Sequence, residues 1–207
     1  MVPILINSKN QLFIDLQMQA LAQHMESQIA ISKEKMDLVL NKFTENHFAK
    51  KEYLLQAGKI SNYVFFISSG CVRTYITDYD GIEHNIFFPS ENWWAGDLQS
   101  FIDRTPASCN IQALEDTITY SISQENWHFL TQNLPEFLKY AQILFRNNII
   151  EQQKRITQYL SFTASERYQY FVEHYPHLVQ RIAQKHIASY LGITPEFLSI
   201  LRNQKIK

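Results

Sequence analysis

The chain has 207 residues, of which 45% are apolar and 19% are charged. These proportions are typical of globular proteins and exclude wholesale disorder, and the length allows one or two compact domains. No apolar run approaches the ~20 residues of a membrane helix. The stretch from Met1 to Ile6 has no basic region for a secretory signal. We therefore expect a soluble cytoplasmic protein with no membrane partner.

Charge is unevenly distributed along the chain. The net charge of −1 argues against a protein that coats nucleic acid indiscriminately. From residue 180 to 207, however, five basic residues stand against one glutamate, a net charge of +4 that leaves −5 for the first 179 residues. A basic end on an acidic body is a reason to look for a nucleic-acid-binding element at the C-terminus.

Cysteine and glycine are both scarce. Cys71 and Cys109 form no CxxC pair or ligand cluster, so we expect reduced structural thiols. Five glycines occur where average usage would give roughly fourteen. They are expected where the backbone needs a positive φ or a close approach. These positions are Gly58, Gly70, Gly81, Gly96 and Gly192.

The first part of the chain, residues 8–46, is predicted to be helical. Apolar residues recur at near-helical spacing between Leu12 and Met25, and Ser32 can cap a second helix. From Lys51 the pattern changes to short β-branched or aromatic runs at intervals of roughly ten residues. The predicted strands are residues 53–55, 63–68, 71–77, 82–88, 109–114 and 117–122.

Turn residues separate these predicted strands. Asp80-Gly81 is a strong signal for a β-hairpin. Short strands at even spacing predict a small sandwich or a barrel-like roll. The aromatic pairs Phe65-Phe66, Phe87-Phe88 and Trp93-Trp94 are interpreted as core residues of this roll and not as a ligand cage.

A long helix is predicted to follow the roll. Ser123 is a good N-cap, and Pro135 can open a helix that reaches about Leu160. A stripe of 3.5-residue spacing along this helix is apolar at five of seven places, which favours a partner helix over a single core helix. We therefore predict a homodimer. Its expected interface residues are Leu138, Phe145, Ile149 and Ile156.

The C-terminal pattern predicts a helix-turn-helix. Thr163 and Glu166 can form a capping box, after a hinge at residues 161–162. Farther on, Ala188 is the small residue where two helices would touch, and Gly192 is the left-handed residue between them. The second helix is predicted to enter the major groove of DNA. The expected DNA-binding residues are Lys185, Thr194, Glu196, Phe197, Ser199, Ile200, Arg202, Asn203 and Lys205.

In this order of elements, from about Ser32, the chain resembles the Crp/Fnr transcription regulators. In that family a cyclic-nucleotide-binding β-roll precedes a long dimer helix and a C-terminal helix-turn-helix. Gly96-Asp97-Leu98 resembles the family's Gly-Glu-Leu segment, which opens the phosphate-binding cassette, and residues 108–113 resemble the second half of that cassette. The resemblance implies an effector pocket formed by Gly96, Asp97, Leu98, Arg104, Ser108 and Cys109.

The fold class implied by this resemblance is α+β. It comprises a double-stranded β-roll, a long dimerisation helix and a small all-α helix-turn-helix domain lacking a complete wing, because the chain ends soon after the recognition helix. The implied divisions are an N-terminal helical segment, the roll, the dimerisation helix and the DNA-binding domain. Their bounds are residues 1–31, 32–134, 135–160 and 161–207.

Departures from the family pattern bear on the ligand. The family's cyclic-AMP binders carry an arginine just before the cassette serine, where this chain has Ala107, and Arg104 could replace it only after the loop rearranges. The cassette glutamate is shortened to Asp97. We therefore expect an unknown effector other than cyclic AMP, either a less charged molecule or none, with the pocket filled by its own side chains. No cofactor is expected.

The favoured function is a sequence-specific transcription regulator that binds double-stranded DNA as a homodimer, with RNA polymerase as a candidate partner. In the recognition helix only Glu196 survives of the family's Arg-Glu-x-x-x-Arg triplet, so the target sequence should differ. The alternatives are a non-DNA signalling or scaffold module that binds proteins, and a β-roll enzyme of the cupin type. His84 lacks companion ligands, and His174 and His177 lack a third, so neither a metal nor an enzyme is expected.

Overall fold

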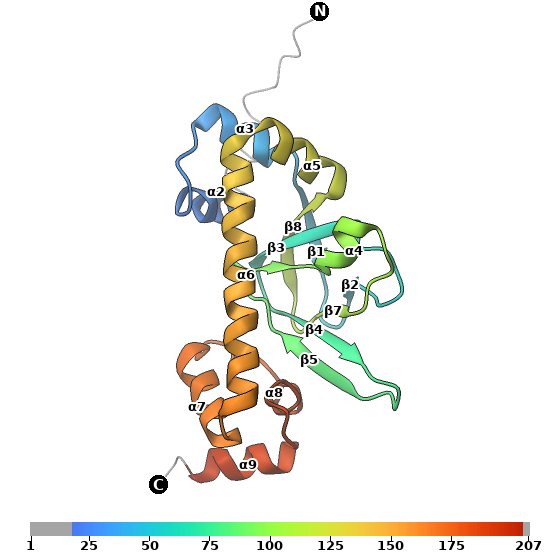
Figure 1. The fold of residues 1–207 in the computed structure, drawn as a ribbon, viewed down its shortest axis with the longest axis vertical. Coiled ribbons are helices and arrows are strands. Elements are labelled where there is room, and N and C mark those ends of the chain that lie inside the picture. The colour runs from blue at the N-terminus through green and yellow to red at the C-terminus, as the bar shows by residue number, and fades with distance from the viewer. Residues whose placement is uncertain (1–17, 205–207) are drawn as a thin grey trace, which may run out of the picture.

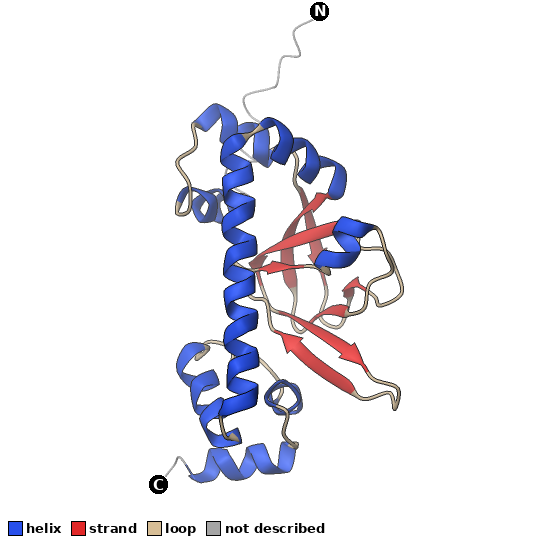
Figure 2. Ribbon diagram, viewed as in Figure 1, coloured by secondary structure: helices blue, strands red, loops and turns tan. Residues whose placement is uncertain are grey.

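One long helix, α6 (Pro135–Ser161), organises the molecule (Figure 1). The computed structural model describes residues 18–204. A β-roll lies along one side of α6, and helices α7 to α9 gather around its C-terminal end (Figure 2). No helix in this described part is both long and apolar enough to cross a bilayer.

The roll consists of two four-stranded antiparallel sheets. Their strand orders are β1-β8-β3-β6 and β2-β7-β4-β5. The six predicted strands are confirmed to within one residue at each end, and the predicted hairpin joins β4 to β5 through Gly81, with φ +80°. The strands are β1 (Thr44–Phe48), β2 (Tyr53–Leu55), β3 (Tyr63–Ser69), β4 (Val72–Thr77), β5 (Glu83–Phe87), β6 (Trp94–Ala95), β7 (Asn110–Ala113) and β8 (Thr117–Ser123).

The helical prediction for residues 8–46 is correct only in part. Helices α2 (Gln19–Glu26) and α3 (Lys33–Leu40) are present, and Ser32 caps α3 as expected. Residues 8–17 lie outside the described residues. Thr44–Phe48, however, is strand β1, because this polar segment pairs along the edge of β8 and takes its hydrogen bonds from there.

An aromatic cluster joins the N-terminal helices, the roll and α6 into one core. Leu21 of α2 packs with Phe66 of β3 and with Phe137 and Tyr140 of α6, all of them fully buried. The Tyr140 hydroxyl accepts a hydrogen bond from Trp94 Nε1 at 3.2 Å. Burial of these rings fixes the N-terminal half of α6 against the roll.

Helix α6 changes character along its length. Pro135 stands at its first turn, as predicted, and its N-terminal half buries Phe137, Tyr140 and Ala141. Farther along, apolar side chains are open to solvent: Ile149 is 65% exposed and Ile156 is 60% exposed. The C-terminal half of the helix therefore presents an apolar stripe that nothing in the described protomer covers.

Five further helices complete the fold within the described residues. Ser123 caps α5, and the predicted capping box of Thr163 and Glu166 opens α7, which confirms both signals. Gly192, at φ +67°, ends α8 and leads into α9. These helices are α4 (Leu98–Asp103), α5 (Gln124–Asn133), α7 (Ala164–His174), α8 (Gln184–Leu191) and α9 (Pro195–Gln204), of which α4 and α5 belong to the roll.

Candidate DNA-contact surface and effector cleft

Helix α9 turns one face inward and one face to solvent. Leu198 and Leu201 are buried against α7 and α8, in contact with the fully buried Ala188. The opposite face is exposed, and it carries the residues that were predicted to read DNA bases. They are Glu196, Phe197, Ser199, Ile200 and Asn203.

The remaining predicted DNA-binding residues flank this face. The hydroxyl of Thr194 accepts a hydrogen bond from the Phe197 N–H at 3.2 Å, so Thr194 caps α9. Lys185 is exposed in the first turn of α8, and Arg202 is half-buried in the last turn of α9. Lys205 lies outside the described residues.

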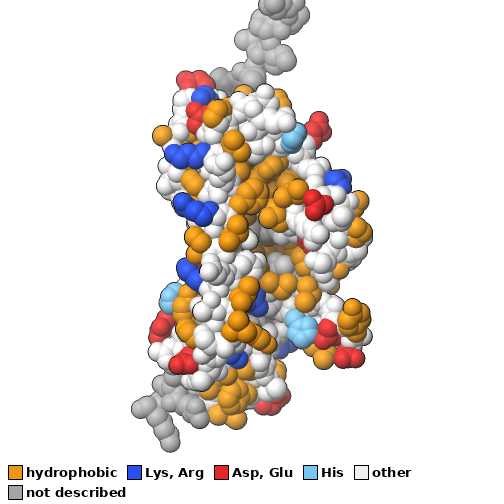
Figure 3. Space-filling model, in the orientation of Figure 1, with side chains coloured by type: hydrophobic (Ala, Val, Ile, Leu, Met, Phe, Trp, Pro, Cys, Tyr) orange, Lys and Arg blue, Asp and Glu red, His pale blue; other side chains and the backbone are white. Residues whose placement is uncertain are grey.

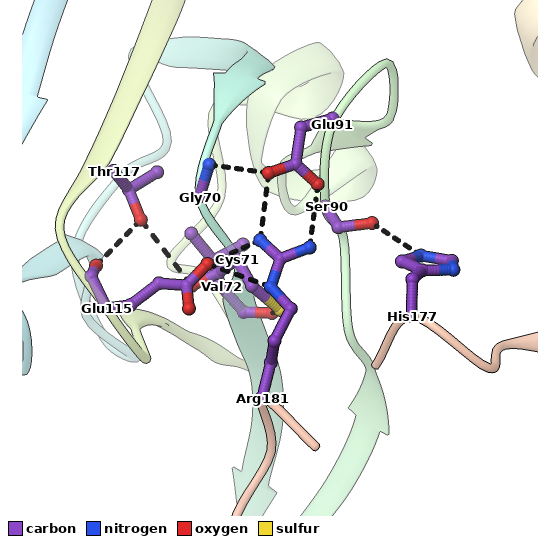
Figure 4. Close-up of polar contacts among 9 residues, drawn as sticks. All are labelled: Gly70, Cys71, Val72, Ser90, Glu91, Glu115, Thr117, His177 and Arg181. Atoms are coloured by element: carbon purple, nitrogen blue, oxygen red, sulfur yellow. Dashed lines mark hydrogen bonds and ion pairs between the residues drawn. The ribbon is translucent and has the colours of Figure 1, made fainter. Parts of the chain in front are cut away.

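Arg181, between α7 and α8, ties this helical end to the roll (Figure 4). Its guanidinium donates two hydrogen bonds to the carboxylate of Glu91, at 2.8 and 2.9 Å, and also contacts Glu115. Glu91 in turn accepts from the N–H of Gly70 at 2.9 Å. The two carboxylates raise the pKa of Arg181 above its already high value. Because both guanidinium nitrogens bind the same carboxylate, this contact fixes the distance and the orientation of the C-terminal helices relative to the roll.

A second contact joins α8 to strand β5. The Ser189 hydroxyl accepts from the Asn85 N–H at 3.0 Å and donates to the Glu83 carbonyl at 2.9 Å. Next to it, Arg73 pairs with the Glu83 carboxylate and lies 3.2 Å from His186 Nδ1. Burial, followed by the charge of Arg73, lowers the pKa of His186 to about 4.

A cleft of about 750 Å³ opens between the roll, α6 and α7. Figure 3 shows hydrophobic side chains gathered in the hollow between α6 and the roll. Of the six predicted effector-pocket residues, five line this cleft, namely Gly96, Asp97, Leu98, Ser108 and Cys109.

Arg104 is the exception, because it does not line the cleft in this structure. It adopts a left-handed conformation as the C-cap of α4, and its Nη2 donates to Asn62 Oδ1 at 2.7 Å, away from the cleft. Ala107 is buried, and its backbone is paired with those of Gly58 and Lys59. This pairing holds the loop in place and leaves Arg104 on the outer surface.

Asp97 is the most heavily bonded side chain in the cleft. Its Oδ1 accepts from the Ser100 N–H at 3.0 Å, which caps α4. Its Oδ2 accepts from the Ser108 N–H at 2.9 Å and the Ser108 hydroxyl at 3.1 Å, and Cys109 Sγ lies at 3.6 Å. Burial alone would raise the pKa of Asp97, but these hydrogen bonds outweigh it and hold the pKa below its usual range.

Sequence reasoning missed several residues of the cleft. Phe87 and Trp93 were interpreted as core, yet both line the cleft, and Trp93 is 40% exposed. Tyr170 and Tyr175 reach the cleft from α7 and its C-cap. The adjacent aromatic pairs were a signal, since neighbouring side chains of a strand point to opposite faces. Phe65 and Phe66 are buried in two different clusters, whereas Phe87 and Trp93 face the cleft.

Phe145 also lies elsewhere than predicted. Its ring packs against Trp127 of α5, with centroids 6.1 Å apart, and it lines the cleft. Phe145 therefore faces its own roll, and we no longer count it among the residues of the proposed dimer interface. The other three predicted residues, Leu138, Ile149 and Ile156, are exposed.

Comparison with known proteins agrees with this geometry. Residues 45–133 match the family model of the cyclic nucleotide-binding domain. No curated protein sequence matches the chain.

Several solved structures are similar to nearly the whole described chain. FixK2 from Bradyrhizobium japonicum is 17% identical, with a TM-score of 0.70 over 78% of this chain and 83% of FixK2. The c-di-GMP-responsive global regulator CLP of Xanthomonas campestris is 13% identical, with a TM-score of 0.68 over 84% of this chain and 91% of CLP. A CooA mutant from Carboxydothermus hydrogenoformans is 23% identical, with a TM-score of 0.64 over 80% of this chain and 77% of CooA.

These findings define the fold as a β-roll followed by a long helix and a helical C-terminal end. Residues 45–133 form a domain of the cyclic nucleotide-binding type, and the chain has the architecture of the Crp/Fnr-family transcription regulators. The resemblance drawn from the sequence motifs is thereby confirmed at the level of the fold.

Proposed function

We propose that the protein is a homodimeric, sequence-specific DNA-binding transcription regulator whose β-roll senses an effector. The observation that carries the proposal is the exposed outer face of α9, which stands on a buried apolar face at the end of the long helix. The two α9 helices of a dimer would lie about one DNA turn apart, ~34 Å, and read a palindrome. The role is non-enzymatic and cytoplasmic, and RNA polymerase remains a candidate partner.

The DNA contacts can be tested by selecting binding sites from random duplexes. Glu196 can accept a hydrogen bond from a cytosine amino group in the major groove. Glu196→Ala should therefore relax specificity at one base pair per half-site, at a cost of ~1–3 kcal/mol. Lys185→Ala should instead weaken binding to all sequences alike and reduce its salt dependence.

An unchanged selected motif in Glu196→Ala would show that α9 does not dock in this way. If the wild type retains no duplex DNA at low salt, the alternative of a signalling module that acts through protein partners is favoured instead.

The proposed dimer rests on the exposed stripe of α6. Ile149→Asp would place two unpaired carboxylates at the seam of the two helices and should split the dimer. Thr157→Asp introduces the same charge at an exposed position of α6 off the stripe, and should leave the dimer intact. Sedimentation at micromolar concentration measures both, and a monomeric wild type would rule the dimer out.

The effector is proposed to be a molecule other than cyclic AMP. Arg104 lies outside the cleft, and Ala107 offers no charge. A cyclic phosphate would therefore lose the charge-assisted hydrogen bonds of a paired arginine, worth ~1.5–3 kcal/mol each. An effector can act on the dimer only by binding one of its arrangements better than another.

A further inference from the structure

The cassette of this protein already holds an anion of its own. The N–H and the hydroxyl of Ser108 both donate to Asp97 Oδ2, so the donors that would meet a ligand phosphate are occupied by a side-chain carboxylate. Asp97 is 8% exposed, and it is tied in place a second time by the Ser100 N–H. The carboxylate of Asp97 thus holds the start of α4 and the segment at Ser108 together.

A phosphate entering the cleft would meet an unfavourable field. It would have to displace Asp97 from Ser108 or lie beside the buried carboxylate, and two like charges at such distances repel each other. Among the described residues that line the cleft, Lys154 is the one lysine or arginine, and it is paired with Glu151 at 2.7 Å. Burial lowers the pKa of His24, which disfavours a positive charge on its ring.

The rest of the lining suits an uncharged ring system. Aromatic side chains contribute flat apolar surface, with Phe87 and Trp93 on one wall and Trp127 and Phe145 on another. Carboxamides supply neutral donors and acceptors around these rings, from Asn92, Gln99, Asn147, Asn148 and Gln152. A volume of about 750 Å³ lies within the range of small-molecule sites, typically ≈ 300–1,000 Å³.

We propose that Asp97 is a built-in anion that excludes phosphate-bearing ligands, and that the cleft binds an uncharged aromatic molecule in their place. This inference rests on the proposed function only in treating the cleft as the effector site. Tyr170 and Tyr175 line the same cleft from the α7 region. Such a ligand would therefore contact the roll and the C-terminal helices together.

Two dyes of the same skeleton and different charge test the proposal. N-phenyl-1-naphthylamine is neutral, and 8-anilino-1-naphthalenesulfonate carries a sulfonate. Fluorescence titration of the full chain should give at least tenfold tighter binding of the neutral dye, and millimolar cyclic AMP should not displace it. Equal affinities, tighter binding of the sulfonate, displacement by cyclic AMP or no binding of the neutral dye would each overturn the proposal.

Two variants test whether Asp97 causes the preference for the neutral dye over the sulfonate. Asp97→Ser keeps an N-cap for α4 and removes the carboxylate, so the sulfonate should bind at least tenfold more tightly than to the wild type. Asp97→Asn removes the charge but keeps a side-chain oxygen for Ser108, and it serves if the serine variant does not fold. An unchanged ratio of the two dyes in a folded variant would contradict the role given to Asp97.

Two glutamate substitutions on α4, one inside the cleft and one outside it, test whether the dye binds in the cleft. Leu98 lines the cleft and is 41% exposed, whereas Ile102 is 53% exposed and does not line it. Leu98→Glu should weaken binding of the neutral dye at least tenfold, and Ile102→Glu should not; equal effects would overturn the location. DNA selection is scored separately, so failure of the dye assay and failure of the proposed regulator are distinguishable.

Discussion

Two glycines with positive φ differ in what surrounds them. Gly81, at φ +80°, has no atom within 4 Å of the place where a Cβ would stand. At Gly70, with φ +98°, that Cβ would lie 2.7 Å from the Asp116 carbonyl oxygen and 2.8 Å from Thr117 Cα. The first glycine is required by backbone conformation alone, and the second also by close packing against the backbone before β8.

Alanine substitutions separate these two causes. Gly81→Ala should lower the free energy of unfolding by about 1–2 kcal/mol, the cost of a left-handed residue with a Cβ. Gly70→Ala should cost about 1–3 kcal/mol more, because the neighbouring backbone must also shift. Urea denaturation of both variants measures the difference. Equal losses in the free energy of unfolding would mean that the backbone at Asp116 and Thr117 shifts without cost to make room for the Cβ.

The contact between Arg181 and the roll is the feature to test at the scale of elements. Its partners Glu91 and Glu115 are 38% and 34% exposed, so solvent screens the attraction and Arg181→Ala should cost about 1 kcal/mol of stability. The larger effect should be local, with faster hydrogen exchange of the α8 amides and unchanged exchange in β3 and β8.

The control for this test is an exposed arginine elsewhere. Arg146→Ala removes a guanidinium that contacts the neighbouring Asn147 at 3.5 Å, and it should leave exchange of α8 unchanged. Arg181→Lys keeps the charge but loses the fork and should fall between the alanine variant and the wild type. Full protection of α8 in Arg181→Ala would show that the contacts of Ser189 and β5 hold the helix by themselves.

Elements with strong local signals could be predicted from the sequence, and elements that depend on a neighbour could not. Pro135, the capping box at Thr163 and the turn at Gly81 each specify structure within a few residues, so α6, α7 and the β4–β5 hairpin were predicted correctly. Strand β1 is polar and forms only because β8 lies beside it. Strand β6 has two residues, too few for any periodic pattern.

The candidate site divides in the same way. The outer face of α9 follows from helical periodicity, since the inward Leu198 determines which neighbours point to solvent. The position of Arg104 depends on the left-handed turn that ends α4, and the bonds of Asp97 depend on where the loop returns to it. Neither is visible in a linear spacing, because each arises when segments distant in sequence are folded together.

The molecule as a whole should lose stability in acid through the junction between the roll and α8. The pKa of His186 is lowered to about 4 from 6.5 by burial and then by Arg73 and Lys185, with Glu83 opposing them. Between these two values the unfolded chain binds more protons than the folded one, so stability is fully present above pH 6.5 and falls as the pH drops toward 4.

A comparison of melting temperatures at pH 7.5 and pH 5 measures this dependence. His186→Gln keeps an acceptor for Arg73 but cannot be protonated, so it should reduce the fall in Tm by about 2–4 °C, equivalent to roughly 1 kcal/mol for a chain of this size. Burial also lowers the pKa of His24, which accounts for a fall that remains in the variant. Identical slopes in variant and wild type would exclude His186 as the cause.

The hydrophobic core beneath the proposed DNA-contact helices, α7 to α9, is built partly from residues of the roll. Cys71 and Phe88 of the roll are buried among the residues of α7 to α9, and the Phe88 ring lies 5.4 Å from Tyr190 and 6.4 Å from Phe171. The C-terminal helices therefore lack part of their own interior when separated from the roll. The roll and helices α7 to α9 should therefore melt in a single cooperative transition. A substitution at Phe88 would need a compensating change on the other side of the junction, so we expect the two parts to evolve together.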